Sequence, residues 1–269
     1  MSDASMNDPL QYEGKKAVVT GAASGVGEAT ATILAELGAE VIGLDIHEAP
    51  AATSSMIVDL RDRSSIDAAV AAIDGPIDAV FSIAGLPGEP FSDIDTVTVN
   101  FIAARHLIES LLAKLSDGAG VVCVGSNAGM GWESDVERFL PIITTTGFDE
   151  TLAWYEANPD AIEHGYVHSK KAINIWVAWR SQTLINDRGI RLNCSNPGPI
   201  QTAMMPAFEE QAGVEVIDMF AGPSGRRSSA EEQAWPLIFA NSPRSSYVAG
   251  ESIRVDAAFL ASTIVPNAG

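Results

Sequence analysis

A glycine-rich turn between an apolar run and a helix-like segment constrains this chain more than any other feature. The apolar run Ala17-Val18-Val19 is typical of a buried strand, and Thr20-Gly21-Ala22-Ala23-Ser24-Gly25-Val26-Gly27 follows it directly. Ala29, Ile33 and Leu37 then recur at intervals of four, which predicts an amphipathic helix. At such a helix N-terminus, backbone N–H groups and the helix dipole face an anion, and glycine lets the backbone approach a phosphate closely.

The next expected strand supplies a carboxylate at the spacing that a dinucleotide requires. This strand, residues 40–44, ends at Asp45, which lies 20 residues after Gly25. A carboxylate about 20 residues beyond the glycines binds the adenosine ribose hydroxyls. The alternative is a strand-to-helix turn with no ligand, but the position of Asp45 favours a dinucleotide site.

Composition and charge narrow the class of protein. The 269 residues are 46% hydrophobic, enough for a sizeable core, and the net charge of −19 disfavours nucleic acid and anionic membranes as partners. Cys123 and Cys194 fall in expected strands, which predicts reduced thiols and a cytoplasmic protein. No close Cys/His cluster is present, so we expect no metal, and no apolar run reaches the ~20 residues of a membrane span.

The order of the expected elements predicts the fold class. We expect residues 1–14 to be a flexible N-terminal segment with no signal peptide, and residues 15–269 to form one domain. Helical patterns separate the later expected strands, which are residues 55–58, 77–83, 120–124, 190–194 and 252–255. This alternation is typical of a doubly wound Rossmann-type α/β domain. We therefore predict a parallel seven-stranded sheet with helices on both faces.

Several motifs together resemble one family. The glycines are spaced G-x-x-x-G-x-G, Ala84-Gly85 follows the strand at 77–83, and Ser126 is followed by Tyr166-x-x-x-Lys170. From about Lys15 to Asp256 the chain resembles the short-chain dehydrogenase/reductase family. In pattern it is nearest to the 3α-hydroxysteroid dehydrogenase/carbonyl reductase and coniferyl-alcohol dehydrogenase-like branch.

The resemblance implies four catalytic residues. Tyr166 would act as general base or acid, and Lys170 would lower the pKa of its phenol and hold the nicotinamide ribose. Ser126 would hydrogen-bond the substrate oxygen, and Asn100, which follows Val99, would place a proton-relay water. Without the family, Asn100 near a helix start would be interpreted as a cap, and Tyr-x-x-x-Lys as decoration of a surface helix.

The resemblance also implies the cofactor residues. They are Gly21, Ser24, Gly25, Val26, Gly27, Asp45, Ile46, Asp59, Leu60, Ala84, Gly85, Tyr166, Lys170, Pro197, Gly198, Ile200 and Thr202. We expect NAD, because Asp45 would repel a 2′-phosphate and neither Ser24 nor Ile46 offers a compensating cation. One departure is Ser82-Ile83, where the family has Asn-Asn, so Ser82 or a water would have to brace the central sheet.

Two segments near the catalytic residues are expected to differ from a minimal member of the family. Residues 127–165 form an insertion with two helix-like stretches, which either gates the substrate or covers an edge. Residues 203–225 are expected to be a substrate lid. Methionines and aromatics in both segments predict an apolar pocket, although at helical spacing such residues are more often core than pocket. The expected substrate-binding residues are Ser126, Met130, Trp132, Met204, Met205 and Phe208, with Phe148 and Trp154 as further candidates for the pocket wall.

These features predict an NAD-dependent enzyme that interconverts an apolar alcohol and the corresponding carbonyl compound on a bulky, aromatic or steroid-like substrate. Two alternatives remain open, an enoyl or imine reductase on the same fold and a non-catalytic dinucleotide-sensing protein. The family also implies a homodimer or homotetramer. Its tetramers pair helices corresponding to residues 100–115 and 166–184, and the insertion could obstruct that pairing and so favour a dimer.

Overall fold

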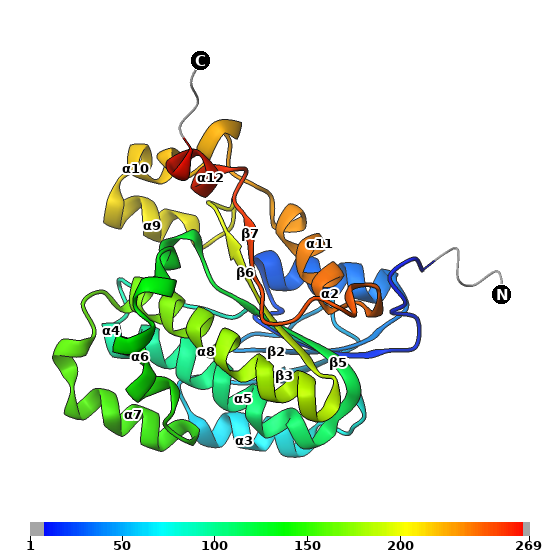
Figure 1. Ribbon diagram of the computed structural model, residues 1–269. Coiled ribbons are helices and arrows are strands. Elements are labelled where there is room, and N and C mark those ends of the chain that lie inside the picture. The colour runs from blue at the N-terminus through cyan, green and yellow to red at the C-terminus, as the bar shows by residue number, and fades with distance from the viewer. Residues whose placement is uncertain (1–7, 266–269) are drawn as a thin grey trace.

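The computed structural model of this protein describes residues 8–265 and forms a three-layer α/β structure around one parallel sheet (Figure 1). Its seven strands run in the order β3-β2-β1-β4-β5-β6-β7, and every neighbouring pair is parallel. The strands are β1 (Lys16–Thr20), β2 (Glu40–Asp45), β3 (Ser54–Ile57), β4 (Ile77–Ser82), β5 (Leu115–Val124), β6 (Arg191–Pro197) and β7 (Ser252–Val255). The predicted doubly wound fold is confirmed.

The strand order reverses between β1 and β4, and this reversal positions the site. Chain connections leave the sheet in opposite directions on the two sides of this point, which opens a crevice at the carboxyl ends of the strands. Val18 of β1 is aligned with Ile42 on one side and Val80 on the other, and all three are buried. The apolar strand cores thus fix the register that brings the glycine turn and the residues after β4 together.

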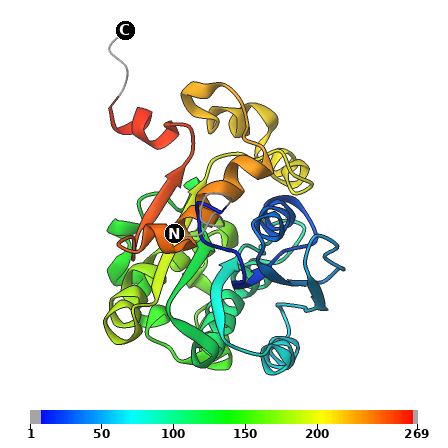
Figure 2. The same ribbon diagram turned by 90° about the vertical axis from the view of Figure 1, so that its right-hand side faces the viewer.

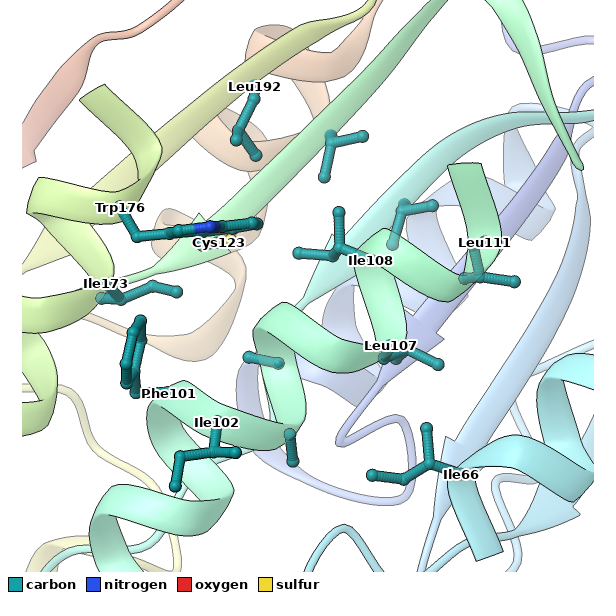
Figure 3. Close-up of a cluster of buried hydrophobic side chains, with 14 of the residues drawn as sticks. Ile66, Phe101, Ile102, Leu107, Ile108, Leu111, Cys123, Ile173, Trp176 and Leu192 are labelled. Carbon is teal, nitrogen blue, oxygen red and sulfur yellow. The ribbon is translucent and has the colours of Figure 1, made fainter. Parts of the chain in front are cut away.

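Helices cover both faces of the sheet (Figure 2). On one face, α2 (Gly25–Glu36) and α11 (Ala230–Asn241) pack together over β1 and its neighbours. On the other face lie α3 (Arg63–Ala72), α5 (Ala104–Leu111) and α8 (Gly165–Arg188). Figure 3 shows the core beneath the second group, where Ile108 of α5 lies on the side of Trp176 of α8 and Leu107 lies on the side of Ile66 of α3.

The long helix that contains Asn100 differs from the expectation that Asn100 begins it. The helix starts earlier, at α4 (Asp93–Val97), where the Ser92 hydroxyl accepts a hydrogen bond from the Asp95 N–H at 3.1 Å. It continues as a π-helix, η1 (Thr98–Ala103), before α5. Asn100 therefore lies inside the π-helical turn and cannot be an N-cap, because Ser92 supplies that cap.

The insertion at residues 127–165 folds as predicted into two helices, α6 (Val136–Ile143) and α7 (Gly147–Ala157), with short 3₁₀ turns around them. At one end of the helix layer, α6 packs against α8, and α7 packs against η1 and α5 (Figure 1). Their inward side chains join the core beneath α5 and α8. These side chains are Phe139, Ile142, Ile143, Phe148 and Tyr155.

The segment at residues 203–225 also contains two short helices, α9 (Met205–Ala212) and α10 (Val214–Met219). They lie beyond the end of β6, next to the C-terminal helix α12 (Phe259–Ile264) (Figure 1). Within 203–225 only Met205 and Ala221 are buried. This segment is therefore attached to the outside of the domain rather than built into its core.

Residues 8–14 differ from the expected flexible segment, whereas residues 1–7 lie outside the described part of the chain. The Tyr12 ring is buried beside Phe81, and its hydroxyl donates a 2.7 Å hydrogen bond to the Ile238 carbonyl of α11. The Asp8 carboxylate accepts from the backbone N–H of Leu10 and Glu13. Residues 8–14 are therefore packed against the domain and hydrogen-bonded to it. Of the helices between residues 8 and 265, none combines the length and apolarity of a membrane span.

Candidate active site

A cavity of about 580 Å³ opens along the carboxyl ends of the strands. Every residue predicted to hold the cofactor lines it, from the glycine turn through Asp45 and Asp59 to Thr202. Ser126, Met204, Met205 and Phe208 line it as well. Three predicted site residues do not, namely Asn100, Met130 and Trp132. No group of three or more possible metal-ligating residues occurs between residues 8 and 265.

The glycine turn leaves room for a ligand that side chains would fill. A Cβ on Gly27 would lie 1.9 Å from the Gly21 carbonyl oxygen, so only glycine lets α2 approach β1 this closely. Gly21 has a φ of +71°, and its Cβ would meet the Ala84 backbone at 2.9 Å. The N-cap residue Ser24 makes no side-chain cap hydrogen bond, which leaves the first N–H groups of α2 for an anion. These residues fit the pyrophosphate of a dinucleotide.

Asp45 faces the same turn from the end of β2. Its two carboxylate oxygens accept hydrogen bonds of 3.1 Å each, from the Ala23 N–H and the His47 N–H. The backbone thereby fixes the carboxylate, and Asp45 remains partly exposed to the cavity. A carboxylate held in this way can accept the hydroxyls of an adenosine ribose.

Thr20 of β1 holds the end of β4, a contact that the expectation for Ser82 did not include. The Thr20 hydroxyl accepts from the N–H of Ile83 at 2.9 Å and of Ala84 at 3.1 Å. Thr20 is buried at the end of β1, directly beside β4. A hydroxyl on the neighbouring strand thus fixes the backbone that follows β4.

Arg61 is a residue at the adenosine end that sequence reasoning missed. Its guanidinium pairs with Asp59, with 2.8 Å between Nη2 and Oδ2, and both residues line the cavity. The hydrogen bonds from Arg61 hold the pKa of Asp59 below its usual value. The available signal was the Asp59-Leu60-Arg61 sequence itself, in which a cation stands two residues after Asp59, an expected cofactor residue.

Tyr166 and Lys170 lie on one face of α8 and point toward the end of β5. The spacing of four residues on a helix brings the Lys170 Nζ to 5.5 Å from the centre of the Tyr166 ring. Lys170 is buried, its Nζ donates to the Val124 carbonyl at 2.9 Å, and burial lowers its pKa to about 8. The ammonium therefore remains the main form at pH 7, although the pKa of Lys170 lies much closer to neutral pH than that of an exposed lysine.

Ser126 follows β5 and faces Tyr166. Its hydroxyl accepts from the Ala128 N–H at 3.1 Å and so caps the turn η3 (Asn127–Gly129). Burial raises the pKa of the Tyr166 phenol, and a hydrogen bond with Ser126 acts in the opposite direction. Ser126, Tyr166 and Lys170 thus form one connected group at the wall of the cavity.

Asn100 lies outside the cavity lining and hydrogen-bonds to residues next to this group. Its Oδ1 accepts from the Leu86 N–H at 2.7 Å, while its Nδ2 donates to the Leu86 carbonyl at 3.0 Å and to the Ser169 hydroxyl at 3.1 Å. The side chain thereby ties the segment after β4 to α8. Gly85 lies between them, and a Cβ there would be 3.1 Å from the Asn100 Oδ1 and 3.7 Å from the Lys170 Nζ.

The apolar part of the cavity is lined by the lid and the segment after β4. Phe208 of α9 packs edge-on against Tyr166, with 5.0 Å between ring centroids. Gln211, one turn further along α9, donates from Nε2 to the Glu89 carbonyl at 2.9 Å. This hydrogen bond joins α9 to the segment after β4. Further lining residues that were missed are Leu86, Phe91, Asn127, His164, Gln211 and Phe220.

The insertion does not bring its large side chains to the cavity, contrary to the predicted substrate contacts. Met130 is partly exposed outside the lining, and Trp132 packs against the hydrophobic core. Gly129 lies so close to α8 that its Cβ would be 2.8 Å from the Lys170 carbonyl oxygen, and the chain turns away from the cavity there. Phe148 and Trp154 also face the core. Residues 130–163 are therefore not among the residues that line the cavity.

Known protein families match both halves of the chain. The short chain dehydrogenase family model matches residues 15–136, which span the glycine turn and Ser126. A model described as Enoyl-(Acyl carrier protein) reductase matches residues 145–259, which span Tyr166 and Lys170.

Relatives and solved structures match almost the full length. The chain is 33% identical to the coniferyl-alcohol dehydrogenase of Pseudomonas sp. strain HR199, over 95% of this chain and 100% of that protein. It is 27% identical to the 3-alpha-hydroxysteroid dehydrogenase/carbonyl reductase of Comamonas testosteroni, over 89% and 94%. The crystal structure of 3-alpha-hydroxysteroid dehydrogenase from Pseudomonas sp. B-0831 complexed with NADH aligns with a TM-score of 0.76 at 26% identity, covering 95% and 100%.

Proposed function

Because the chain belongs to the short-chain dehydrogenase/reductase family of oxidoreductases, we propose that it is an NAD-dependent enzyme that interconverts an alcohol and a carbonyl compound. The observation that carries the proposal is that Ser126, Tyr166 and Lys170 meet at the wall of a cavity whose other end is the glycine turn and Asp45. A protein that only sensed dinucleotides would not need a proton-transfer group beside the cofactor.

The chain's own residues can carry the proton through the reaction. The Tyr166 hydroxyl exchanges the proton of the substrate oxygen, and Ser126 hydrogen-bonds the same oxygen. The Lys170 ammonium lies 5.5 Å from the ring centre, where its positive charge favours a negatively charged phenolate. When bound, the nicotinamide supplies the hydride chemistry. We propose that Asn100 places a relay water through the backbone of η1, since its side chain is already paired.

We propose that NAD is preferred over its 2′-phosphorylated form. The fixed carboxylate of Asp45 accepts ribose hydroxyls and repels a phosphate, and Arg61, the nearby cation, is paired with Asp59. The test is kcat/KM with both cofactors for the wild type and for Asp45→Ser. Comparable values for the wild type would contradict the preference, and a rise in use of the phosphorylated cofactor by Asp45→Ser supports it.

We propose a bulky apolar or aromatic alcohol, or the corresponding ketone, as substrate. The cavity beside Tyr166 is walled by Phe91, Met205, Phe208 and Phe220, and such surfaces stabilise a ring system by about 25 cal/mol per Å² buried. The names of the matched relatives, a coniferyl-alcohol and a 3-alpha-hydroxysteroid dehydrogenase, point to the same class. The test is a kcat/KM series from short aliphatic to cinnamyl-type and steroid alcohols, and fastest turnover of the short alcohols would contradict it.

Tyr166→Phe tests the catalytic assignment itself. We expect turnover to be lost while NAD binding, measured by calorimetry, is nearly unchanged, because the ring and Lys170 remain. Activity within about tenfold of the wild type would place proton transfer elsewhere. An enoyl reductase is the second candidate, because the model matching residues 145–259 carries that description. Reduction of conjugated C=C bonds in preference to C=O bonds would favour it.

We also propose a symmetric homodimer in the cytoplasm. The insertion helices pack on η1, α5 and α8, the helices that tetramers of the family pair, so this face is partly covered. Cys123 and Cys194 are buried free thiols, which suits a reducing compartment. Light scattering that gives a monomer at micromolar concentration would contradict the oligomer.

A further inference from the structure

Two buried asparagines lie between the strand end that carries Ser126 and the helix that carries Tyr166 and Lys170. Asn196 stands at the end of β6 and Asn174 on α8, and they are 6% and 1% exposed. Neither lines the cavity. A buried asparagine leaves polar atoms out of water, so its hydrogen-bond partners decide what it contributes.

Every polar atom of the two side chains has partners inside the protein. The Asn196 Oδ1 accepts from the Ser126 backbone N–H at 3.0 Å and from the Asn174 Nδ2 at 2.9 Å. The Asn196 Nδ2 donates to the Asn174 Oδ1 at 3.0 Å and to the Ser252 hydroxyl at 2.8 Å. Ser252 donates in turn to the Asn174 Oδ1 at 2.7 Å, and the Asn174 Nδ2 donates to the Lys170 carbonyl at 2.8 Å.

This network joins the backbone of Ser126 to the backbone of Lys170 through two rigid amides. Because each donor and acceptor is satisfied away from water, the bonds strengthen one another and permit one arrangement. The amide orientations follow from the partners, since the Lys170 carbonyl can only accept and the Ser126 N–H can only donate.

The chain next to Ser126 is shaped around the same network. A Cβ on Gly125 would lie 2.1 Å from the Asn196 Oδ1 and 2.9 Å from the Asn174 Nδ2. Position 125 therefore has no room for a side chain, which explains the glycine there. The residue before the catalytic serine and the two amides form one close-packed unit, in which a shift of either amide moves the Ser126 backbone.

We infer that Asn196 and Asn174 are positioning residues that set the place of the Ser126 hydroxyl relative to Tyr166. The inference rests on the proposed function, in which Ser126 holds the substrate oxygen. Misplacing such a group by about 1 Å can cost on the order of 100-fold in rate, so a network that touches no substrate can control the chemical step. Loss of the network should lower kcat more than it weakens cofactor binding.

The first test asks whether Asn196 holds the backbone of Ser126 in place, and it compares Asn196→Ala with the matched control Asn193→Ala. Asn193 is equally buried on β6, but its partners are the Val248 carbonyl and the Glu251 N–H, away from the site. Backbone amide exchange of Ser126 is measured by NMR relative to that of Val122 in β5, which corrects for global stability. We expect the ratio to rise about tenfold in Asn196→Ala and to change less than twofold in Asn193→Ala. An unchanged ratio in Asn196→Ala would overturn the inference.

The second test asks whether the network affects the chemical step more than cofactor binding. It measures turnover with NAD and cinnamyl alcohol, and the affinity for NAD by calorimetry. At equal folded fraction we expect kcat to fall about tenfold or more in Asn196→Ala, with Kd for NAD within about twofold and Asn193→Ala close to the wild type. A kcat within twofold of the wild type in Asn196→Ala would overturn the inference.

Two further outcomes are distinguished. If Asn196→Ala does not fold, Ser252→Ala removes one hydrogen bond from each asparagine, and we expect about a threefold loss of kcat. An unchanged kcat in that variant would overturn the inference. If the wild type oxidises no alcohol of the series, the proposed function fails, and the exchange ratio alone then supports or overturns the positioning of Ser126.

Discussion

The insertion at residues 127–165 and the lid at residues 203–225 resemble each other in sequence and differ in the structure. Both follow a strand end at the cavity, and both carry large apolar side chains. In the insertion these side chains enter the main core, whereas in the lid Val214 and Met219 remain exposed and Phe208 faces the cavity. Apolar composition therefore does not distinguish a segment that extends the core from one that lines the cavity.

The polar contacts explain the difference. The insertion is held by buried groups: the Arg105 guanidinium donates to the Ile142 carbonyl at 3.3 Å and to the Thr145 hydroxyl at 3.1 Å. Tyr155 and His168 of α8 make a buried hydrogen bond of 3.0 Å. The lid is held at its rim, by ion pairs of Arg227 with Glu209 and Asp218 and by the bond from Gln211. Breaking buried hydrogen bonds lowers the free energy of unfolding, whereas breaking exposed ion pairs and hydrogen bonds lowers it little.

Phe148→Ala gives the largest expected effect on the side of the insertion. The ring is buried in the core and lies edge-on to His106, so its removal leaves a cavity. We expect a loss of about 3–5 kcal/mol in the free energy of unfolding, measured by denaturant titration. The kcat/KM of the folded fraction should stay within about twofold of the wild type. A changed substrate preference would instead make the insertion part of the substrate site.

We expect acid to lower the free energy of unfolding through His168 of α8, which hydrogen-bonds Tyr155 of the insertion. Burial lowers its pKa to about 4, whereas the usual value is 6.5. Between these values the unfolded chain binds more protons than the folded one, so stability falls as the pH falls, by about 1.4 kcal/mol per pH unit for this group. The measurement is chemical denaturation at pH 7 and pH 5 for the wild type and for His168→Gln. Equal pH dependence in the two proteins would show that His168 does not contribute.

Phe208→Ala applies the same side-chain change to the lid. Because Phe208 is only partly buried and packs on Tyr166, we expect the free energy of unfolding to change by less than about 1 kcal/mol. The kcat/KM for a cinnamyl-type alcohol should fall about tenfold, which corresponds to about 1.4 kcal/mol. Val216→Ala, an exposed change on α10 outside the cavity lining, is the control. If Phe208→Ala destabilises as much as Phe148→Ala, the contrast between the two regions fails.

Gln211→Ala should have the smallest effect. It removes the hydrogen bond to the Glu89 carbonyl across the cavity, and a partly exposed hydrogen bond is worth about 0.5–1.5 kcal/mol. We expect KM for the bulky alcohol to rise about threefold, with unchanged stability, because the lid opens more often. Glu210→Ala, an exposed change at the preceding position, serves as control. Unchanged KM would mean that the ion pairs of Arg227 hold the lid without help.

The sequence predicts those parts of the molecule that depend on local pattern. The strands, the helical insertion and α11 follow from apolar periodicity, and the glycine turn follows from spacing. Side-chain direction in the insertion could not be predicted, because Trp132 and Phe148 suit a core and a cavity equally well. Contacts between distant elements were also beyond the sequence: Thr20 beneath Ala84, and Asn196 beneath Ser126, become neighbours only when the sheet forms.

The π-helix η1 has a consequence for how the length of the chain can change. In a regular α-helix each residue adds about 100° of rotation, so losing one residue within α5 would turn Leu107 and Leu111 away from the sheet. A π-helical turn holds one residue more than the α-helical turn it replaces. A one-residue deletion within Thr98–Ala103 would restore α-helical pairing and leave the apolar face of α5 where it is. The turn that contains Asn100 is thus a point where this helix can lose a residue while the core keeps its register.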